Sequence, residues 1–195
     1  MQLNSSEYLN KWNNTALSES FATLLPVVSE YLKKEYGFEI HDAPDFRHRT
    51  ALGFSGNLLD LSEYVSVELK TYISLHLFGV AVQLAECLDA RERDQAVARI
   101  CQTRLDHRGN DRPLILFDQR ATEYAAQVLV ELNKSELIPW LSALAVADRL
   151  FAEDQLTKNG TKGFNEFRAE VTPAPLTPRP IPSVTLQAIT TRYAT

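Results

Sequence analysis

Residues 65–77, VSVELKTYISLHL, are the stretch that decides the predicted fold. Their odd-numbered positions hold Val, Val, Leu, Thr, Ile, Leu and Leu, and their even-numbered positions hold Ser, Glu, Lys, Tyr, Ser and His. Apolar side chains at every second position give a β-strand one buried face and one polar face. The pattern therefore predicts a strand that begins at residue 65 and ends near Ser74, with Gly79 marking a break before the next element.

Helical spacing precedes this stretch. Apolar side chains recur every three or four positions in residues 16–36, which predicts an amphipathic helix. Pro26 lies inside that helix and predicts a kink or a break, whereas Gly37 predicts its C-terminal stop. Residues 38–41 are a short strand candidate that leads into a turn-rich segment, residues 42–57.

Helical spacing also follows it. Residues 80–105 predict a helix, and residues 114–117, LILF, form a second strand candidate because turn residues bound this short apolar run. Further helical stretches are predicted at residues 121–132, 135–153 and 164–171. Together these elements predict an α+β fold that is mostly helical, with a small mixed or antiparallel sheet and an extended C-terminal arm.

The proline content divides the chain into two parts. Residues 1–171 are long enough to form a single domain with a buried core. Five of the nine prolines fall in residues 172–182, TPAPLTPRPIP, and such density favours an extended chain with little tendency to fold alone. Residues 172–195 are therefore predicted to be an arm that lies on a neighbour. Its candidate interface residues are Pro175, Pro178, Arg179, Pro180, Pro182, Val184, Leu186 and Ile189.

The charge of the chain is acidic overall but uneven. A formal net charge of −5 gives no general attraction to nucleic acid. Arginines are dense after residue 90, and they form either a stripe that contacts phosphate or a partner, or an ordinary solvated helix face with internal ion pairs. The candidate contacts are Arg91, Arg93, Arg99, Arg104, Arg108 and Arg112.

Neither the N-terminal residues nor the apolar runs of the sequence are typical of a membrane protein. The N-terminal residues have no basic region followed by an apolar one, and no apolar run approaches the ~18 residues of a membrane helix. The expected location is therefore cytoplasmic, without a membrane partner.

Residues 64–71, YVSVELKT, resemble the central motif of the PD-(D/E)XK nuclease family, in which an acidic residue and a lysine share one strand face. Glu68 and Lys70 match those two residues, and the preceding aspartate has two matches, Asp45 and Asp60. The resemblance implies an enzyme in which two carboxylates hold Mg²⁺ and the lysine orients the water that attacks a nucleic-acid phosphate. An exposed Glu/Lys pair is equally typical of ordinary cross-strand pairing.

The order of the predicted elements resembles that of tail-terminator and related neck proteins of tailed bacteriophages. Those chains are similar in having an amphipathic helix, a variable loop, a long alternating strand and a further helix. Here residues 17–36, 42–61, 65–74 and 91–105 take those places. The resemblance implies a structural protein of the phage virion, a ring-forming homo-oligomer present in the host cytoplasm and then in the virion.

The favoured interpretation is thus a non-enzymatic assembly protein that needs no cofactor. Its partners would be copies of itself and other assembly proteins, reached through protein–protein contacts of the arm. The alternative is the Mg²⁺-dependent nuclease, for which nucleic acid is the partner. A third interpretation, a helical adaptor that binds one other protein, shares the lack of catalytic residues. Residues 175–180, PLTPRP, also resemble a ligand of proline-recognition modules, with Arg179 as the orienting charge, although a stiff tether has the same composition.

Overall fold

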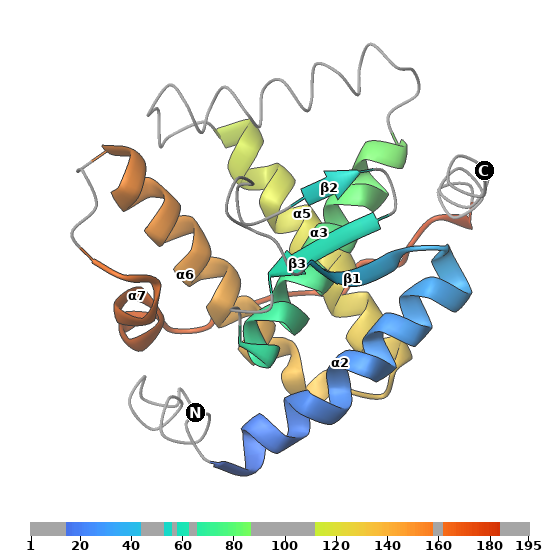
Figure 1. Ribbon diagram of the computed structural model, residues 1–195. Coiled ribbons are helices and arrows are strands. Elements are labelled where there is room, and N and C mark those ends of the chain that lie inside the picture. Colours follow the sequence, from blue (N-terminus) through green and yellow to red (C-terminus); the bar gives the residue numbers. More distant parts are fainter. Residues whose placement is uncertain are drawn as a thin grey trace.

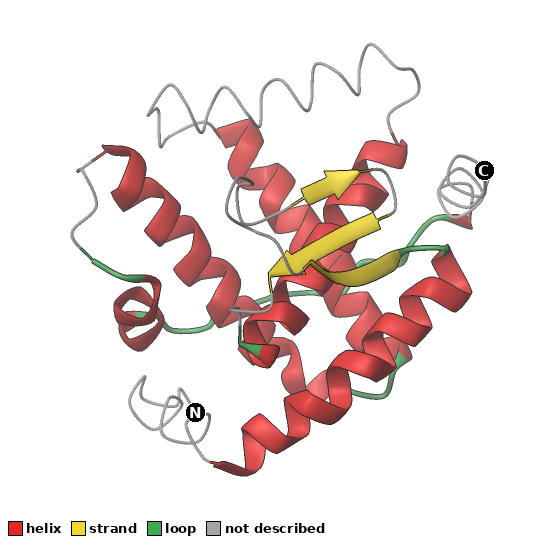
Figure 2. Cartoon of the chain, viewed as in Figure 1, coloured by secondary structure: helices red, strands yellow, loops and turns green. Residues whose placement is uncertain are grey.

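The computed structural model describes residues 15–43, 53–55, 58–62, 66–86, 112–157 and 162–183. Helices predominate among them (Figures 1 and 2), which confirms the predicted mainly helical character. The helices are α2 (Thr15–Tyr36), α3 (Val67–Glu86), α5 (Arg112–Glu131), the short 3₁₀ helix η1 (Ser135–Leu137), α6 (Ile138–Thr157) and α7 (Phe164–Glu170). None of the helices in these residues is both long enough and apolar enough to cross a membrane.

Three short strands lie beside the helices. They are β1 (Glu39–Ala43), β2 (Gly53–Ser55) and β3 (Leu58–Ser62), and their order in the sheet is β1-β3-β2. Strand β1 pairs with β3 in parallel, from Glu39 opposite Leu58 to Ala43 opposite Ser62, whereas β2 pairs with β3 in antiparallel fashion. The predicted strand at residues 38–41 corresponds to β1.

The strand predicted from residue 65 to Ser74 is wrong, because this stretch belongs to helix α3. Burial along it does not alternate: Lys70 and Tyr72 are buried although they occupy even positions, and Leu69 at an odd position is only half-buried. The deeply buried side chains instead include a series at helical spacings of four and three residues, Thr71, Leu75, Phe78 and Val82, with Ser74 and Ala81 buried beside it.

Local and tertiary features both explain why α3 is helical. The Ser66 hydroxyl accepts a hydrogen bond from the Leu69 N–H (3.3 Å) and so caps the first turn. Twelve of the twenty residues of α3 are buried, because the helix lies between α2 and α5 (Figure 1). A helix that is surrounded on several sides shows no single apolar stripe, and its 3.6-residue period is therefore weak in the sequence.

Two neighbouring helices also differ from the predictions. Residues 114–117, predicted as a strand, lie inside α5, which begins at Arg112. Helix α2 continues on both sides of Pro26, so of the predicted kink or break the break is absent. The predicted stop at Gly37 is confirmed: its φ of 65° is left-handed, and its N–H donates to the Lys33 carbonyl (3.0 Å).

Helices α3 and α5 approach each other at Gly79. A Cβ atom at this position would overlap the backbone of Ala121 and lie 2.9 Å from its Cα. Gly79 therefore marks a close helix contact and not the predicted break between elements.

The main core lies between these helices and receives side chains from α2, α3, α5 and α6. Aromatic rings are prominent in it, and Phe21 packs against Trp140 with ring centroids 4.7 Å apart. The largest fully buried side chains are Trp140, Phe21, Phe38, Phe78, Leu32, Leu75, Leu129, Leu141 and Leu144. This core holds α5 and α6 in place, and those two helices carry the surface described next.

Candidate functional site

The residues of the expected nuclease site do not share a strand. Glu68 and Lys70 lie two positions apart on helix α3, where successive residues turn by about 100° and such a pair points to different sides. Asp60 lies on β3, and Asp45 falls outside the described residues. The prediction that Glu68 and Lys70 share one strand face is therefore wrong.

Glu68 instead joins three helices. Its Oε1 accepts hydrogen bonds from Trp140 Nε1 on α6 (2.8 Å) and from Arg168 Nη2 on α7 (2.6 Å). The side chains of Arg168 and Glu68 are only 22% and 19% exposed, so this ion pair is partly shielded from water. These contacts give Glu68 a role in holding α6 and α7 against α3.

Most of the arginine stripe lies outside the described residues. This applies to Arg91, Arg93, Arg99, Arg104 and Arg108, whereas Arg112 is the first residue of α5. In the part of the chain that is described, no group of three or more His, Cys, Asp or Glu side chains is arranged to hold a metal ion.

The C-terminal segment provides the candidate site. Residues 172–182, here called the strap, follow α7 as an extended chain and pass across the molecule on the side of α5 and α6 (Figure 1). Three further interface candidates, Val184, Leu186 and Ile189, fall outside the described residues. Residues 172–182 of the predicted arm thus contact helices of their own chain.

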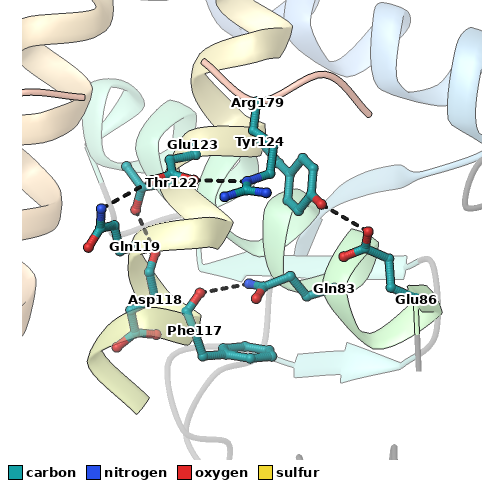
Figure 3. A network of polar contacts seen from close by, with 9 residues as sticks. All are labelled: Gln83, Glu86, Phe117, Asp118, Gln119, Thr122, Glu123, Tyr124 and Arg179. Carbon is teal, nitrogen blue, oxygen red and sulfur yellow. Dashed lines mark hydrogen bonds and ion pairs between the residues drawn. The ribbon is translucent and has the colours of Figure 1, made fainter. Parts of the chain in front are cut away.

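Arg179 is the residue of the strap with the most polar contacts. Its Nε donates to Glu123 Oε2 (2.9 Å), and its backbone N–H donates to the Glu123 carbonyl (3.0 Å). Its guanidinium carbon lies 5.8 Å from the centroid of the Tyr124 ring, an arrangement typical of a cation–π contact. Figure 3 shows Arg179 between the Glu123 carboxylate and the Tyr124 ring. The hydrogen bond with Glu123 raises the pKa of Arg179, which stays charged.

Neighbouring side chains fix the two α5 residues that receive Arg179. The Tyr124 hydroxyl donates to Glu86 at the end of α3 (3.0 Å), and burial together with this bond raises the pKa of Tyr124 to about 12. Gln119 Nε2 donates to Glu123 Oε1 (3.1 Å), so the carboxylate is held from both sides (Figure 3). The site is therefore organised by α3 and α5 before the strap adds its own groups.

Apolar and backbone contacts hold the remainder of the strap. The Ser142 hydroxyl on α6 donates to the Ala174 carbonyl (2.7 Å), and Leu176 and Ile181 pack against the main core. Three of the predicted proline contacts, Pro175, Pro178 and Pro180, lie between these anchors, and Pro182 follows the last of them. Pro178 is half-buried, whereas Pro175, Pro180 and Pro182 are exposed.

The arrangement is suited to recognition of an extended peptide. An acidic group, an aromatic ring and apolar contacts together can bind a proline-rich segment that carries one arginine. The sequence indicated Arg179 as an orienting charge, but it gave no indication of Glu123 and Tyr124, which look like ordinary residues of a helix face.

Comparisons with known proteins do not identify the chain. No family model matches it, and no curated protein or solved structure does. The contacts of the strap therefore carry the functional argument.

Proposed function

We propose that the protein is a structural assembly protein, not an enzyme, and that it acts through self-association and docking of its C-terminal arm. The observation that carries this proposal is the recognition of the strap by α5 and α6. The Glu123 side chain and backbone both engage Arg179, and Ser142 engages Ala174. Subunits are commonly fastened together by an extended segment of one subunit that binds to the folded surface of another.

The concrete form of the proposal is a homo-oligomeric ring subunit comparable to a phage neck or tail-terminator protein. Its partners would be copies of itself and other assembly proteins, and it would pass from the host cytoplasm into the virion. The proposal includes the finer parts of the fold class, a small mixed or antiparallel sheet and an extended C-terminal arm. It rests on the strap and not on the order of elements, since the expected long strand is helix α3.

The alternative, a Mg²⁺-dependent nuclease with nucleic acid as its partner, has less support. It needs Glu68 free to hold a metal ion beside Lys70, whereas Glu68 is engaged by Trp140 and Arg168. Mg²⁺ and nucleic acid belong to this alternative alone.

The solution mass of the full chain tests the proposed function. We expect a mass several times that of one chain at micromolar concentration, and a smaller mass for a variant that ends at Val171 and so lacks the strap. An unchanged circular dichroism spectrum of that variant would show that the domain stays folded without its arm. A single-chain mass at all concentrations, combined with Mg²⁺-dependent cleavage of DNA or RNA that Glu68→Ala abolishes, would overturn the proposal in favour of the nuclease.

A further inference from the structure

The contacts that bind the strap do not depend on which copy of the chain supplies it. Glu123 and Ser142 contact strap residues that are 56 and 32 positions away in the sequence. The packing of Leu176 and Ile181 likewise involves helices distant in sequence. A strap from another copy would therefore meet the same donors, acceptors and apolar contacts as the chain's own strap.

A short connection joins the strap to its own domain. Val171 is 5% exposed, and its N–H donates to the Phe167 carbonyl (3.1 Å), which fixes the start of the segment on α7. Among the described residues, the first hydrogen bond of the strap is accepted by the Ala174 carbonyl. Only residues 172 and 173 lie between these two anchors, and a change of direction there redirects everything that follows.

The composition of the strap favours exchange over local refolding. Its five prolines cannot donate backbone hydrogen bonds, and they hold the chain extended. An extended proline-rich segment loses little conformational freedom on docking. Moving it from its own domain to a neighbour therefore exchanges equivalent contacts at low cost, which is the condition for swapping a segment between identical subunits.

We propose that the surface formed by Glu123, Tyr124 and Ser142 is the acceptor for the strap of a second copy, with Arg179 as the residue that the acceptor recognises. The inference rests on the proposed assembly function and names the surface that receives the arm. In an isolated chain the acceptor holds its own strap, because the attached segment has a high effective concentration. When copies are held side by side, exchange links each subunit to the next, and exchange repeated head to tail closes a ring.

Charge reversal on the two sides of the ion pair gives a direct test. Glu123→Arg and Arg179→Glu are prepared separately in the full chain, and each places like charges together within one subunit. In a mixture, the arginine strap of the first variant meets the native Glu123 of the second, and the glutamate strap of the second meets the introduced arginine of the first. Both acceptors are then filled only between chains.

We expect each variant alone to have the mass of one chain, and the equimolar mixture to form complexes that contain both variants in equal numbers. Native mass spectrometry should show that multi-chain complexes are about tenfold or more abundant in the mixture than in a sample of either variant alone. The control is the double variant Glu136→Arg, Arg179→Glu mixed with Arg179→Glu, since Glu136 is exposed on η1 and its side chain is 65% accessible. Every strap in that mixture carries glutamate and every acceptor keeps Glu123, so no acceptor is filled between chains and no such complexes should appear.

Two folded variants whose mixture contains only single chains would overturn the inference. If a reversed charge prevents folding, a photo-reactive p-benzoylphenylalanine in place of Leu176 gives the decisive measurement. Isotopically light and heavy full chains are mixed at increasing concentration and irradiated. Cross-links from position 176 to α5 or α6 of the other isotope support exchange, and cross-links confined to one chain at every concentration exclude it.

The outcomes separate this inference from the proposed function. Mixed-variant complexes together with a wild-type chain that never assembles would establish the acceptor and overturn the ring proposal. A wild-type assembly that either charge reversal leaves unchanged would retain the assembly function and remove the acceptor from it.

Discussion

Glu68 accepts hydrogen bonds from the Trp140 indole and the Arg168 guanidinium where three helices meet. Glu68→Ala leaves both donors without this acceptor in a partly buried place, so we expect a loss of about 1–3 kcal/mol in the free energy of unfolding. Urea denaturation measures it. The matched control is Glu136→Ala, whose exposed pair with Lys134 spans 3.9 Å and should contribute about 0.5 kcal/mol or less. Equal losses in the two variants would contradict the structural role of Glu68.

Gly79 sits where helices α3 and α5 are closest. Gly79→Ala improves helix propensity by about 1 kcal/mol, but the new methyl group meets the Ala121 backbone, which cannot turn away as a side chain can. Overpacking of this kind costs about 1–3 kcal/mol or more, so we expect a net loss of stability and a lower melting temperature. Gly163→Ala is the control, because its added Cβ would lie 3.7 Å from the nearest atom, Glu166 Oε1. A stabilised Gly79→Ala variant would show that the two helices separate easily.

At the level of elements, α2 and α5 are joined through a shared carboxylate. The hydroxyls of Tyr31 and Tyr36 donate to Glu131 Oε2 at 2.6 and 2.9 Å. Burial and then the bond to Glu131 raise the pKa of Tyr31 to about 12 from an ordinary value of 10.0, and the same two causes raise the pKa of Tyr36. Only the protonated hydroxyl can donate, so the folded state binds these protons more tightly than the unfolded state does.

The sign of the resulting pH dependence follows from these shifts. The stabilisation is fully present below pH 10 and is lost as the pH rises toward 12, because the unfolded tyrosines ionise first. We expect the urea midpoint to fall over this range. The decrease should be shallower in the double variant Tyr31→Phe, Tyr36→Phe. It should not vanish, because the pKa of Tyr124 is raised as well. An identical decrease in the wild type and the double variant would contradict the role of the two hydroxyls.

At the level of the whole molecule, the strap contributes to the fold as well as to the proposed assembly. Leu176 and Ile181 are half-buried against the main core, so Leu176→Ala combined with Ile181→Ala should cost about 1–3 kcal/mol. The same variant should speed hydrogen exchange at the Arg179 amide, which donates to the Glu123 carbonyl. Thr177→Ala, at an exposed position of the strap, is the control. An Arg179 amide that exchanges quickly in the wild type would show that the strap is not held.

The residues that could be identified from the sequence were those whose role is local. Gly37 ends α2 because a left-handed turn favours glycine, and that preference belongs to the residue itself. Arg179 stood out as the single charge of a proline-rich run. The prediction did not use Ser66, whose hydroxyl caps the first turn of α3, because the alternating pattern of residues 65–77 pointed to a strand.

The sequence by itself determined the mainly helical character and the amphipathic helix α2 with its stop at Gly37. Each follows from backbone preferences or from a one-sided apolar pattern. Only the tertiary structure decided that α3 is a helix, because neighbours on several sides removed the one-sided pattern from its residues. Only the tertiary structure, too, brought Arg179 to Glu123 across 56 positions of the chain, since contacts at that separation depend on how α5 and α6 pack and not on any local preference.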